Sequence, residues 1–156
     1  MSDLLREVNE KDIVFEYLYK GFHNAAITGM DICEQRPLIA TCSQPDSTIR
    51  IWNYRSFGCK LLRMFYFKVK EEFDCDKPLL TLAFHPCGYY MAVGCVDKLR
   101  VFHILNAELR PYREVGVRGA HIVKFSRGGH LMAACFPFRE EANVNHIKVF
   151  NALTLE

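Results

Sequence analysis

The chain has 156 residues, half of them hydrophobic, which is enough for one ordinary domain with a buried core. Its 20 lysine and arginine residues are balanced by 18 aspartate and glutamate residues, and the small excess of positive charge is spread along the chain. We therefore expect neither nucleic acid nor a membrane as partner, because there is no basic block and no apolar run near the roughly 18 residues that cross a bilayer.

The chain opens with an expected N-terminal extension at residues 1–12, MSDLLREVNEKD. This segment is acidic where a secretion signal has a basic region followed by an apolar one, which predicts a cytoplasmic protein. The next segment, IVFEYLYK at 13–20, has the residue types of a single strand.

Three segments then repeat one pattern: strand, tight turn, strand, turn, strand. They are ITGMDICEQRPLIATCS with PDSTIRIWNY, LLTLAFHPCGYYMAVGC with VDKLRVFHI, and GAHIVKFSRGGHLMAAC with NHIKVFN. Ala40, Ala92 and Ala133 recur about 52 and 41 residues apart, near the period of about 40 to 45 residues of a WD40 propeller blade, with longer loops accounting for the excess. The repeat predicts an all-β chain of about three WD40 blades.

The expected partial propeller covers residues 13–156, and it starts with 13–20 as the outer strand of a preceding blade. A blade at 21–66, a blade at 79–115 and an incomplete blade at 119–156 follow. The predicted strands are Ile27–Cys33, Leu38–Ser43, Thr48–Tyr54, Cys59–Tyr66, Leu79–His85, Tyr89–Cys95, Lys98–Ile104, Glu108–Val115, Ala120–Ser126, His130–Phe136 and His146–Asn151.

The first blade contains the polar residues that resemble the structural tetrad of WD40 repeats. They are His23, Thr41 or Ser43, Asp46 and Trp52. A hydrogen-bonded chain from the indole N–H through the hydroxyl to the imidazole and the carboxylate is expected to join the parts of the blade. The rival interpretation makes His23 and Asp46 a catalytic pair that activates Ser43, but no GxSxG motif or comparable glycine loop accompanies them. We therefore predict no catalytic residues.

The second and third blades depart from this pattern. Cys75 stands where the histidine aligns in the second blade, and Asp97 lies one residue closer to Phe102 than Asp46 lies to Trp52. In the third blade Gly116 replaces the histidine. Phe102 and Phe150 stand in the position of the tryptophan, where their rings are expected to fill the space between blades.

Seven cysteines are scattered along the chain without a CxxC pair. Several alternate with apolar residues in predicted strands, which is typical of free thiols in a reducing compartment. Neither cysteine nor histidine recurs at ligand spacing, so no metal and no cofactor are predicted.

Two longer loops are candidate partner-binding sites, because long loops on a rigid scaffold often bind ligands. One contains Lys68, Lys70, Glu71 and Glu72, and the other contains Arg139 and Glu140. A solvated face for the first and a tolerated insertion for the second are the alternative interpretations.

Several stretches have a more specific resemblance, among them IATCS, VGCVDKLR and SRGGHLMAA. They resemble the start of the second propeller in the cilia- and flagella-associated WD-repeat proteins of the protein 57 family. The resemblance implies a scaffold of the ciliary or flagellar axoneme, part of the cytoskeleton, that lies on doublet microtubules and helps to place or regulate inner dynein arms. The alternative is a general WD40 adaptor in a cytosolic complex.

Propellers generally close with about four to eight blades, whereas this chain predicts about three. The open edges that result favour association with another surface. We therefore expect a fragment whose propeller is completed by another chain or by the missing blades.

Overall fold

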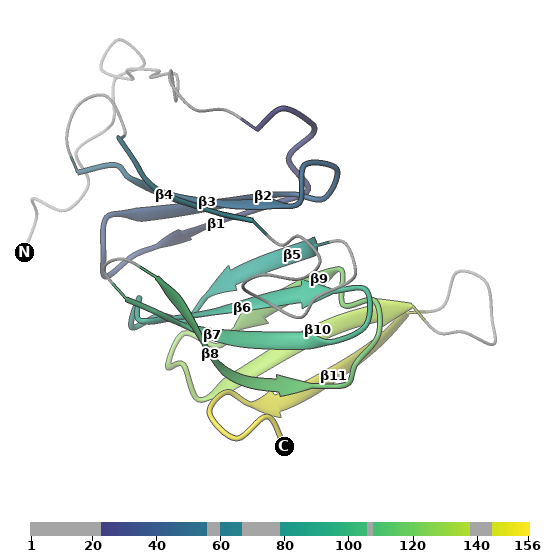
Figure 1. Cartoon of the computed structure of the whole chain (residues 1–156). Helices are drawn as coiled ribbons and strands as arrows, with labels where there is room; N and C mark the ends of the chain where they lie inside the picture. The colour runs from purple at the N-terminus through teal and green to yellow at the C-terminus, as the bar shows by residue number, and fades with distance from the viewer. Residues whose placement is uncertain (1–22, 56–59, 67–78, 106–107, 138–144) are drawn as a thin grey trace, which may run out of the picture.

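The computed structural model describes residues 23–55, 60–66, 79–105, 108–137 and 145–156, and it contains eleven strands in three antiparallel sheets. The sheets are stacked one on the next in chain order (Figure 1). Every strand predicted within these ranges has a counterpart, so the prediction of an all-β chain of about three blades is confirmed. The predicted extension at 1–12 and the predicted strand at 13–20 lie outside the described residues.

Each sheet is one blade, and its strands pair in sequence order. The first blade consists of β1 (Gly29–Cys33), β2 (Leu38–Ser43), β3 (Thr48–Asn53) and β4 (Lys60–Tyr66). The second consists of β5 (Leu79–Phe84), β6 (Tyr90–Cys95), β7 (Leu99–Ile104) and β8 (Leu109–Val115). The third consists of β9 (Ile122–Phe125), β10 (Leu131–Pro137) and β11 (Asn145–Asn151).

Two of the tight turns depend on a glycine. Gly88 joins β5 to β6 with φ of 72°, and Gly129 joins β9 to β10 with φ of 73°. A side chain is unfavourable in this left-handed conformation, which explains why the turns HPCG and SRGG have glycine there. The amide of each glycine donates to the carbonyl three residues earlier, His85 or Ser126, and so closes the turn.

The core lies between the sheets because alternate residues of each strand point to opposite faces. Between the first two blades, Ile49 and Ile51 of β3 pack in one cluster with Phe84 and Phe102 of the second blade. Between the second and third blades, Val101 packs in another cluster, which also contains Ala83, Ala92, Val123, Met132, Ala134 and Phe150. The middle blade is therefore covered on both faces.

Candidate functional site

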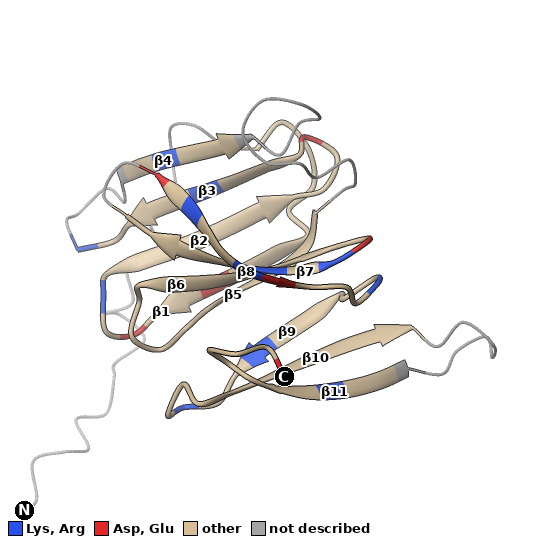
Figure 2. Ribbon diagram, turned by 60° about the horizontal axis from the view of Figure 1, so that its bottom comes forward, with Lys and Arg blue, Asp and Glu red and all other residues tan. Residues whose placement is uncertain are grey.

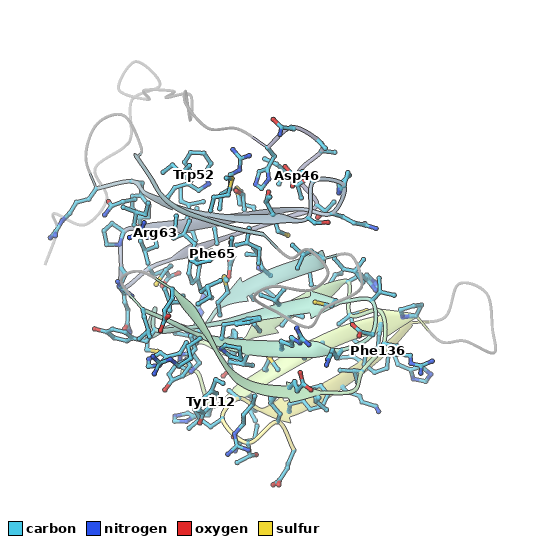
Figure 3. The ribbon with its side chains drawn as sticks, viewed as in Figure 1. Asp46, Trp52, Arg63, Phe65, Tyr112 and Phe136 are labelled. Carbon is cyan, nitrogen blue, oxygen red and sulfur yellow. The ribbon has the colours of Figure 1, made fainter. Side chains whose placement is uncertain are left out.

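The most connected polar group in the described residues is a hydrogen-bonded network in the first blade. Its members are Trp52, Thr41, His23, Asp46 and Thr48, which we call the first-blade network. Trp52 is on β3, Thr41 on β2, Thr48 at the start of β3, and Asp46 in the turn between β2 and β3. Figure 3 shows Trp52 and Asp46 on the side of the first sheet that faces away from the second blade, whereas Phe65 points toward it.

The network starts at the indole of Trp52, which is 1% exposed, and whose Nε1–H donates to Thr41 Oγ1 at 3.0 Å. The Thr41 hydroxyl in turn lies 2.8 Å from His23 Nε2. On its other side, the imidazole Nδ1 lies 3.1 Å from Asp46 Oδ2 and 2.9 Å from Thr48 Oγ1. The network thus joins residue 23, which precedes β1, to both strands at the centre of the blade.

The partners determine which ring nitrogen of His23 carries a proton. Asp46 carboxylate oxygens only accept, so Nδ1–H donates to Asp46 Oδ2. Thr41 Oγ1 already accepts from the indole, and the same oxygen lies within hydrogen-bonding distance of Nε2. The histidine side chain is only 2% exposed, and both of its nitrogens are occupied within the blade.

The carboxylate of Asp46 receives four donors. They are the Thr48 hydroxyl at 2.6 Å, the Thr48 amide at 3.1 Å, the Asn24 amide at 3.1 Å and the His23 imidazole. Burial by itself raises the pKa of this carboxyl, but the hydrogen bonds from Thr48 and His23, the nearby imidazole and the Asn24 amide together lower the pKa below its ordinary value of 3.8.

This lowered pKa gives a stability that depends on pH. A carboxyl with a lower pKa in the folded state contributes stability that is fully present above its unfolded pKa and is lost as the pH falls through the folded pKa. Asp46→Asn keeps an acceptor oxygen but loses the charge, so at pH 7 it should lower the free energy of unfolding by about 1 kcal/mol.

Urea unfolding of both proteins from pH 7 to pH 3 measures this effect. The difference between the wild type and Asp46→Asn should shrink as the pH falls below the ordinary value of 3.8. A difference that stays constant over this range would contradict the assigned role of the charge. Glu34→Gln, at an exposed carboxylate outside the first-blade network, is a control for removing one surface charge.

The structure distinguishes Thr41 from Ser43, the two residues that the sequence offered for the hydroxyl of the tetrad. Thr41 is in the network, whereas Ser43 Oγ is buried and has no hydrogen-bond partner among the described residues. Ser43 is 0% exposed and pairs with Thr48 across the sheet. Thr48 is the member that the sequence analysis did not name, although its position two residues after Asp46 is the usual place for a residue whose amide caps an Asx-type turn.

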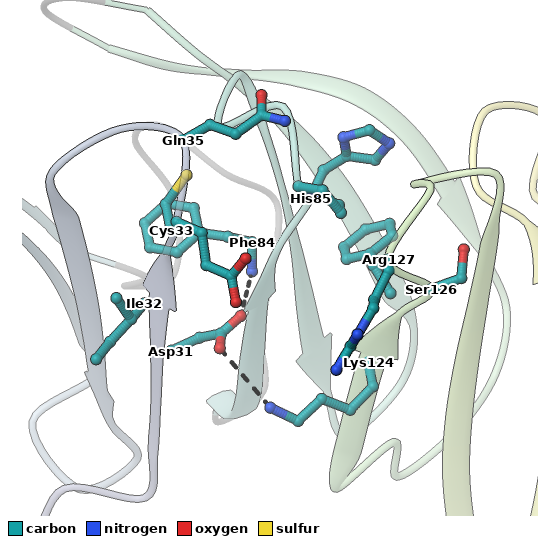
Figure 4. A pocket seen from close by; sticks show the side chains of 12 residues that line it. Asp31, Ile32, Cys33, Gln35, Phe84, His85, Lys124, Ser126 and Arg127 are labelled. Atoms are coloured by element: carbon teal, nitrogen blue, oxygen red, sulfur yellow. Dashed lines mark hydrogen bonds and ion pairs between the residues drawn. The ribbon is translucent and has the colours of Figure 1, made fainter. Parts of the chain in front are cut away.

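A second polar region lies where the innermost strands end. There, β5 lies between β1 and β9, and the three blades surround a cavity of about 460 Å³. Asp31 Oδ2 accepts the amide of Phe84 at 2.7 Å, and Lys124 Nζ lies 3.7 Å from Asp31 Oδ1 (Figure 4). The cavity is lined by Asp31, Ile32, Cys33, Glu34, Gln35, Phe84, His85, Pro86, Lys124, Phe125, Ser126 and Arg127. The carboxylate of Asp31 in the first blade is thus already bound to residues of the second and third blades.

Two further hydrogen bonds join neighbouring blades at this end, and both end on a turn glycine. Arg36 donates to the carbonyl of Gly88 at 2.9 Å, and His85 Nε2 lies 2.9 Å from the carbonyl of Gly129. Because a carbonyl only accepts, His85 has its proton on Nε2, and Nδ1 accepts from the amide of Cys87. The first and second blades thus each bind the turn glycine of the following blade, through different side chains.

The second blade has charges in place of the tetrad. Lys98 and Arg100 both contact Glu114, at 3.1 and 3.2 Å. Figure 2 shows positively and negatively charged residues close together where β7 and β8 lie side by side. Asp97 Oδ1 is buried without a hydrogen-bond partner in the part of the chain that the structure describes. The Phe102 ring is 0% exposed in the position of Trp52, so packing rather than a polar chain fills this interface.

The predicted loop residues are not placed by the structure. Lys68, Lys70, Glu71, Glu72, Arg139 and Glu140 all lie outside the described residues, as does Cys75. Within the described ranges, no three His, Cys, Asp or Glu side chains are grouped so as to hold a metal ion. In the same ranges, no helix has the length and hydropathy needed to cross a bilayer.

Comparison with known protein families agrees with the geometry of the first blade. The family model of the WD domain, G-beta repeat, matches residues 16–53, which contain all of the first-blade network. The three sheets are WD40 blades. The second and third blades have the same strand order as the first over their described strands, although their polar residues have diverged.

Curated relatives cover more of the chain. Cilia- and flagella-associated protein 57 of Mus musculus is 43% identical over 142 residues, which is 91% of this chain and 10% of that protein. Cilia- and flagella-associated protein 57 A of Tetrahymena thermophila is 31% identical over 96% of this chain and 10% of its own length. The resemblance to the protein 57 family is confirmed, and the chain spans about a tenth of the relatives that it matches.

Solved structures support the WD40 fold alone. Sqt1 of Saccharomyces cerevisiae superimposes with a TM-score of 0.55 at 12% identity, over 72% of this chain and 30% of that one. The hydrazine synthase of Kuenenia stuttgartiensis gives a TM-score of 0.61 at 10% identity, over 80% and 34%. In both cases the WD40 blades align with about a third of a longer chain.

Proposed function

We propose that the chain is a non-catalytic, protein-binding WD40 module of the ciliary or flagellar axoneme. The observation that carries the proposal is its 43% identity, over 91% of the chain, with a mouse protein named for cilia and flagella. The match extends well beyond the generic repeat at residues 16–53 and includes the sequence of all three blades.

The first-blade network supports a structural role. A catalytic histidine needs one nitrogen within reach of a substrate or of an exposed nucleophile. Both nitrogens of His23 are bound inside the blade, and the hydroxyls of Thr41 and Thr48 are 1% and 2% exposed. Ser43, the nucleophile of the rival interpretation, is fully buried. These groups are arranged to hold the blade together.

The finer role follows from the resemblance. We propose that the module binds components of the doublet microtubule, the inner dynein arm or a regulatory complex, and contributes to placing or regulating that dynein. WD40 blades provide rigid loops for such contacts. The chain has no requirement for a cofactor in this role, and its expected location is the axonemal cytoskeleton.

Expression of the chain with a fluorescent tag in a ciliated cell tests the proposal. We expect enrichment along the axoneme that remains after detergent extraction, with the tag alone as control. Pull-down from the extracted axonemes should recover dynein or doublet components. Signal confined to the cytosol, with cytosolic partners in the pull-down, would instead indicate a general WD40 adaptor and overturn the axonemal assignment.

A further inference from the structure

The inner turn of the second blade places a thiol beside a histidine. Cys87 Sγ, in the turn between β5 and β6, lies 2.9 Å from Nδ1 of His85. On one side, Arg36 of the first blade donates to the carbonyl of Gly88, the next residue of this turn. On the other side, His85 reaches the carbonyl of Gly129 in the third blade. The pair therefore lies in a blade that has a neighbour on each side.

The imidazole of His85 is oriented to accept a proton from this thiol. Its Nε2–H donates to the carbonyl of Gly129 at 2.9 Å, which leaves a lone pair on Nδ1. The rings of Tyr90 and Phe125 contact the imidazole edge to face, with centroids 6.0 and 5.1 Å away, and restrict its rotation. Nδ1 lies closer to Sγ of Cys87 than to its amide nitrogen, at 2.9 Å against 3.2 Å. After proton transfer, both N–H groups of the ring still have an acceptor, the thiolate and the carbonyl.

The other described cysteines lack this arrangement. Three of them are at most 1% exposed, namely Cys33, Cys42 and Cys95. Burial raises the pKa of the Cys42 thiol to about 11, which keeps that thiol protonated and unreactive at neutral pH. Cys135 is partly exposed like Cys87, but its Sγ lies 3.7 Å from Nε2 of His121. Among the described thiols, Cys87 alone combines partial exposure with a close proton acceptor.

A cavity adjoins the histidine of this pair. It is the cavity of about 460 Å³ between the three blades, and His85 belongs to its lining (Figure 4). Its volume lies in the range of about 300 to 1,000 Å³ that is typical of small-molecule sites. Of the four Asp, Glu, Lys and Arg side chains in the lining, Asp31 and Lys124 pair with each other. The other two, Glu34 and Arg127, have opposite charges and no ion pair among the described residues. The cavity is therefore complementary to a ligand that has both a carboxylate and an ammonium group.

We propose that Cys87 is a modification site that forms a mixed disulfide with a zwitterionic peptide disulfide of low mass, of the class of glutathione disulfide. The carboxylate and the ammonium group of the peptide lie in the cavity, at Arg127 and Glu34. The site is separate from the role in binding proteins, and it needs no feature of the axoneme.

The reaction is a thiol–disulfide exchange. Nδ1 of His85 takes the proton of the Cys87 thiol, and the thiolate attacks one sulfur of the peptide disulfide. A bond from Cys87 to that sulfur forms as the original S–S bond breaks, and the leaving thiolate takes the proton from His85. One thiol and one disulfide thus give a mixed disulfide and one free peptide thiol. The sulfur of Cys87 is oxidised, the leaving sulfur is reduced, and a dithiol reductant reverses the reaction.

The rate of modification at Cys87 tests the role of the histidine. The purified chain is incubated with glutathione disulfide at pH 7, and peptide mass spectrometry follows each cysteine. His85→Gln keeps a donor for the carbonyl of Gly129 but has no basic nitrogen, so the rate at Cys87 should fall at least about tenfold. His103→Gln is the matched control, because this histidine of the same blade stacks on Tyr90 instead of contacting a thiol, and it should keep the wild-type rate. Equal rates for the wild type and His85→Gln would overturn the proposal.

A second measurement needs no variant. In urea the Cys87 thiol is fully accessible, but the imidazole is no longer held 2.9 Å from it. The rate at Cys87 should therefore be at least about tenfold lower in the unfolded wild type than in the folded wild type. In the folded protein, Cys87 should be modified before Cys135. A faster reaction of Cys87 in the unfolded chain would show that burial controls this thiol, and it would overturn the proposal.

A further variant tests the place of the peptide. Arg127→Gln should lower the rate with glutathione disulfide by about threefold, the effect of losing one exposed ion pair. The rate with bis(2-hydroxyethyl) disulfide, which has no charge, should not change. Equal losses with both disulfides, or no loss with either, would overturn the placement of the peptide in the cavity. Tagging in cells tests the axonemal assignment independently of all these rates.

Discussion

Replacing Trp52 with alanine should lower the free energy of unfolding by about 3 to 5 kcal/mol, the range for truncation of a large buried aromatic side chain. The indole is 1% exposed, so its removal leaves a cavity on the first blade. It also removes the donor to Thr41 and leaves that buried hydroxyl with one partner fewer. Urea unfolding followed by far-UV circular dichroism measures the effect, since the variant has no tryptophan for fluorescence.

Trp52→Phe separates packing from hydrogen bonding. Phenylalanine occupies the equivalent positions 102 and 150 and keeps an aromatic ring, but it has no N–H donor. Trp52→Phe should lower the free energy of unfolding clearly less than Trp52→Ala does. About 1 kcal/mol of its effect should come from the lost hydrogen bond. A loss below about 1 kcal/mol for Trp52→Ala would contradict the role of the indole in the core.

Gly94→Ala should have the second largest effect. It should lower the free energy of unfolding by up to about 3 kcal/mol, the upper end of the range for overpacking. A methyl group at this position of β6 would lie 2.4 Å from the carbonyl oxygen of Ala120 and 2.8 Å from Thr81 Cγ2. The first of these atoms is backbone and cannot rotate away. The substitution therefore separates the second and third blades or shifts the segment that precedes β9.

Gly116→Ala is the matched control. Among the described residues, apart from its two chain neighbours, no atom lies within 4 Å of the position that its methyl group would take, so the free energy of unfolding should stay within about 0.5 kcal/mol of the wild type. Thermal unfolding of the two variants in parallel measures the difference. Equal melting temperatures for Gly94→Ala and Gly116→Ala would show that the close approach of Ala120 does not limit the packing of the blades.

The repeats made the fold predictable from the sequence. Alternating apolar residues and the turn glycines 88 and 129 recur at blade-like intervals, and local patterns of this kind specify both the strands and their order. The resemblance of longer stretches to one family was also visible in the sequence. By contrast, the residues outside the described ranges contain every predicted binding-loop position, so those positions remain predictions.

The candidate site was less predictable, for geometric reasons. Thr41 and Ser43 point to the same face of β2, so alternation does not distinguish them; they differ by about 7 Å along the strand, and only the nearer one is reached by the indole. Predicting Thr48 as a member of the network required the conformation of the turn at Asp46, which brings the Thr48 hydroxyl to that carboxylate. The contacts of Arg36 and His85 with glycine carbonyls depend on how one blade is placed against the next, which no spacing within a single repeat encodes.

The chain contains one tryptophan, and it lies in the first blade. Its emission therefore reports on that blade alone, while the circular dichroism signal averages over the strands of all three blades. In stacked repeats each unit is stabilised mainly by its neighbours, so an end unit can open before the others. If the fluorescence transition precedes the dichroism transition in urea, the loss of order begins at the first blade, and the intrinsic fluorophore records it without any label.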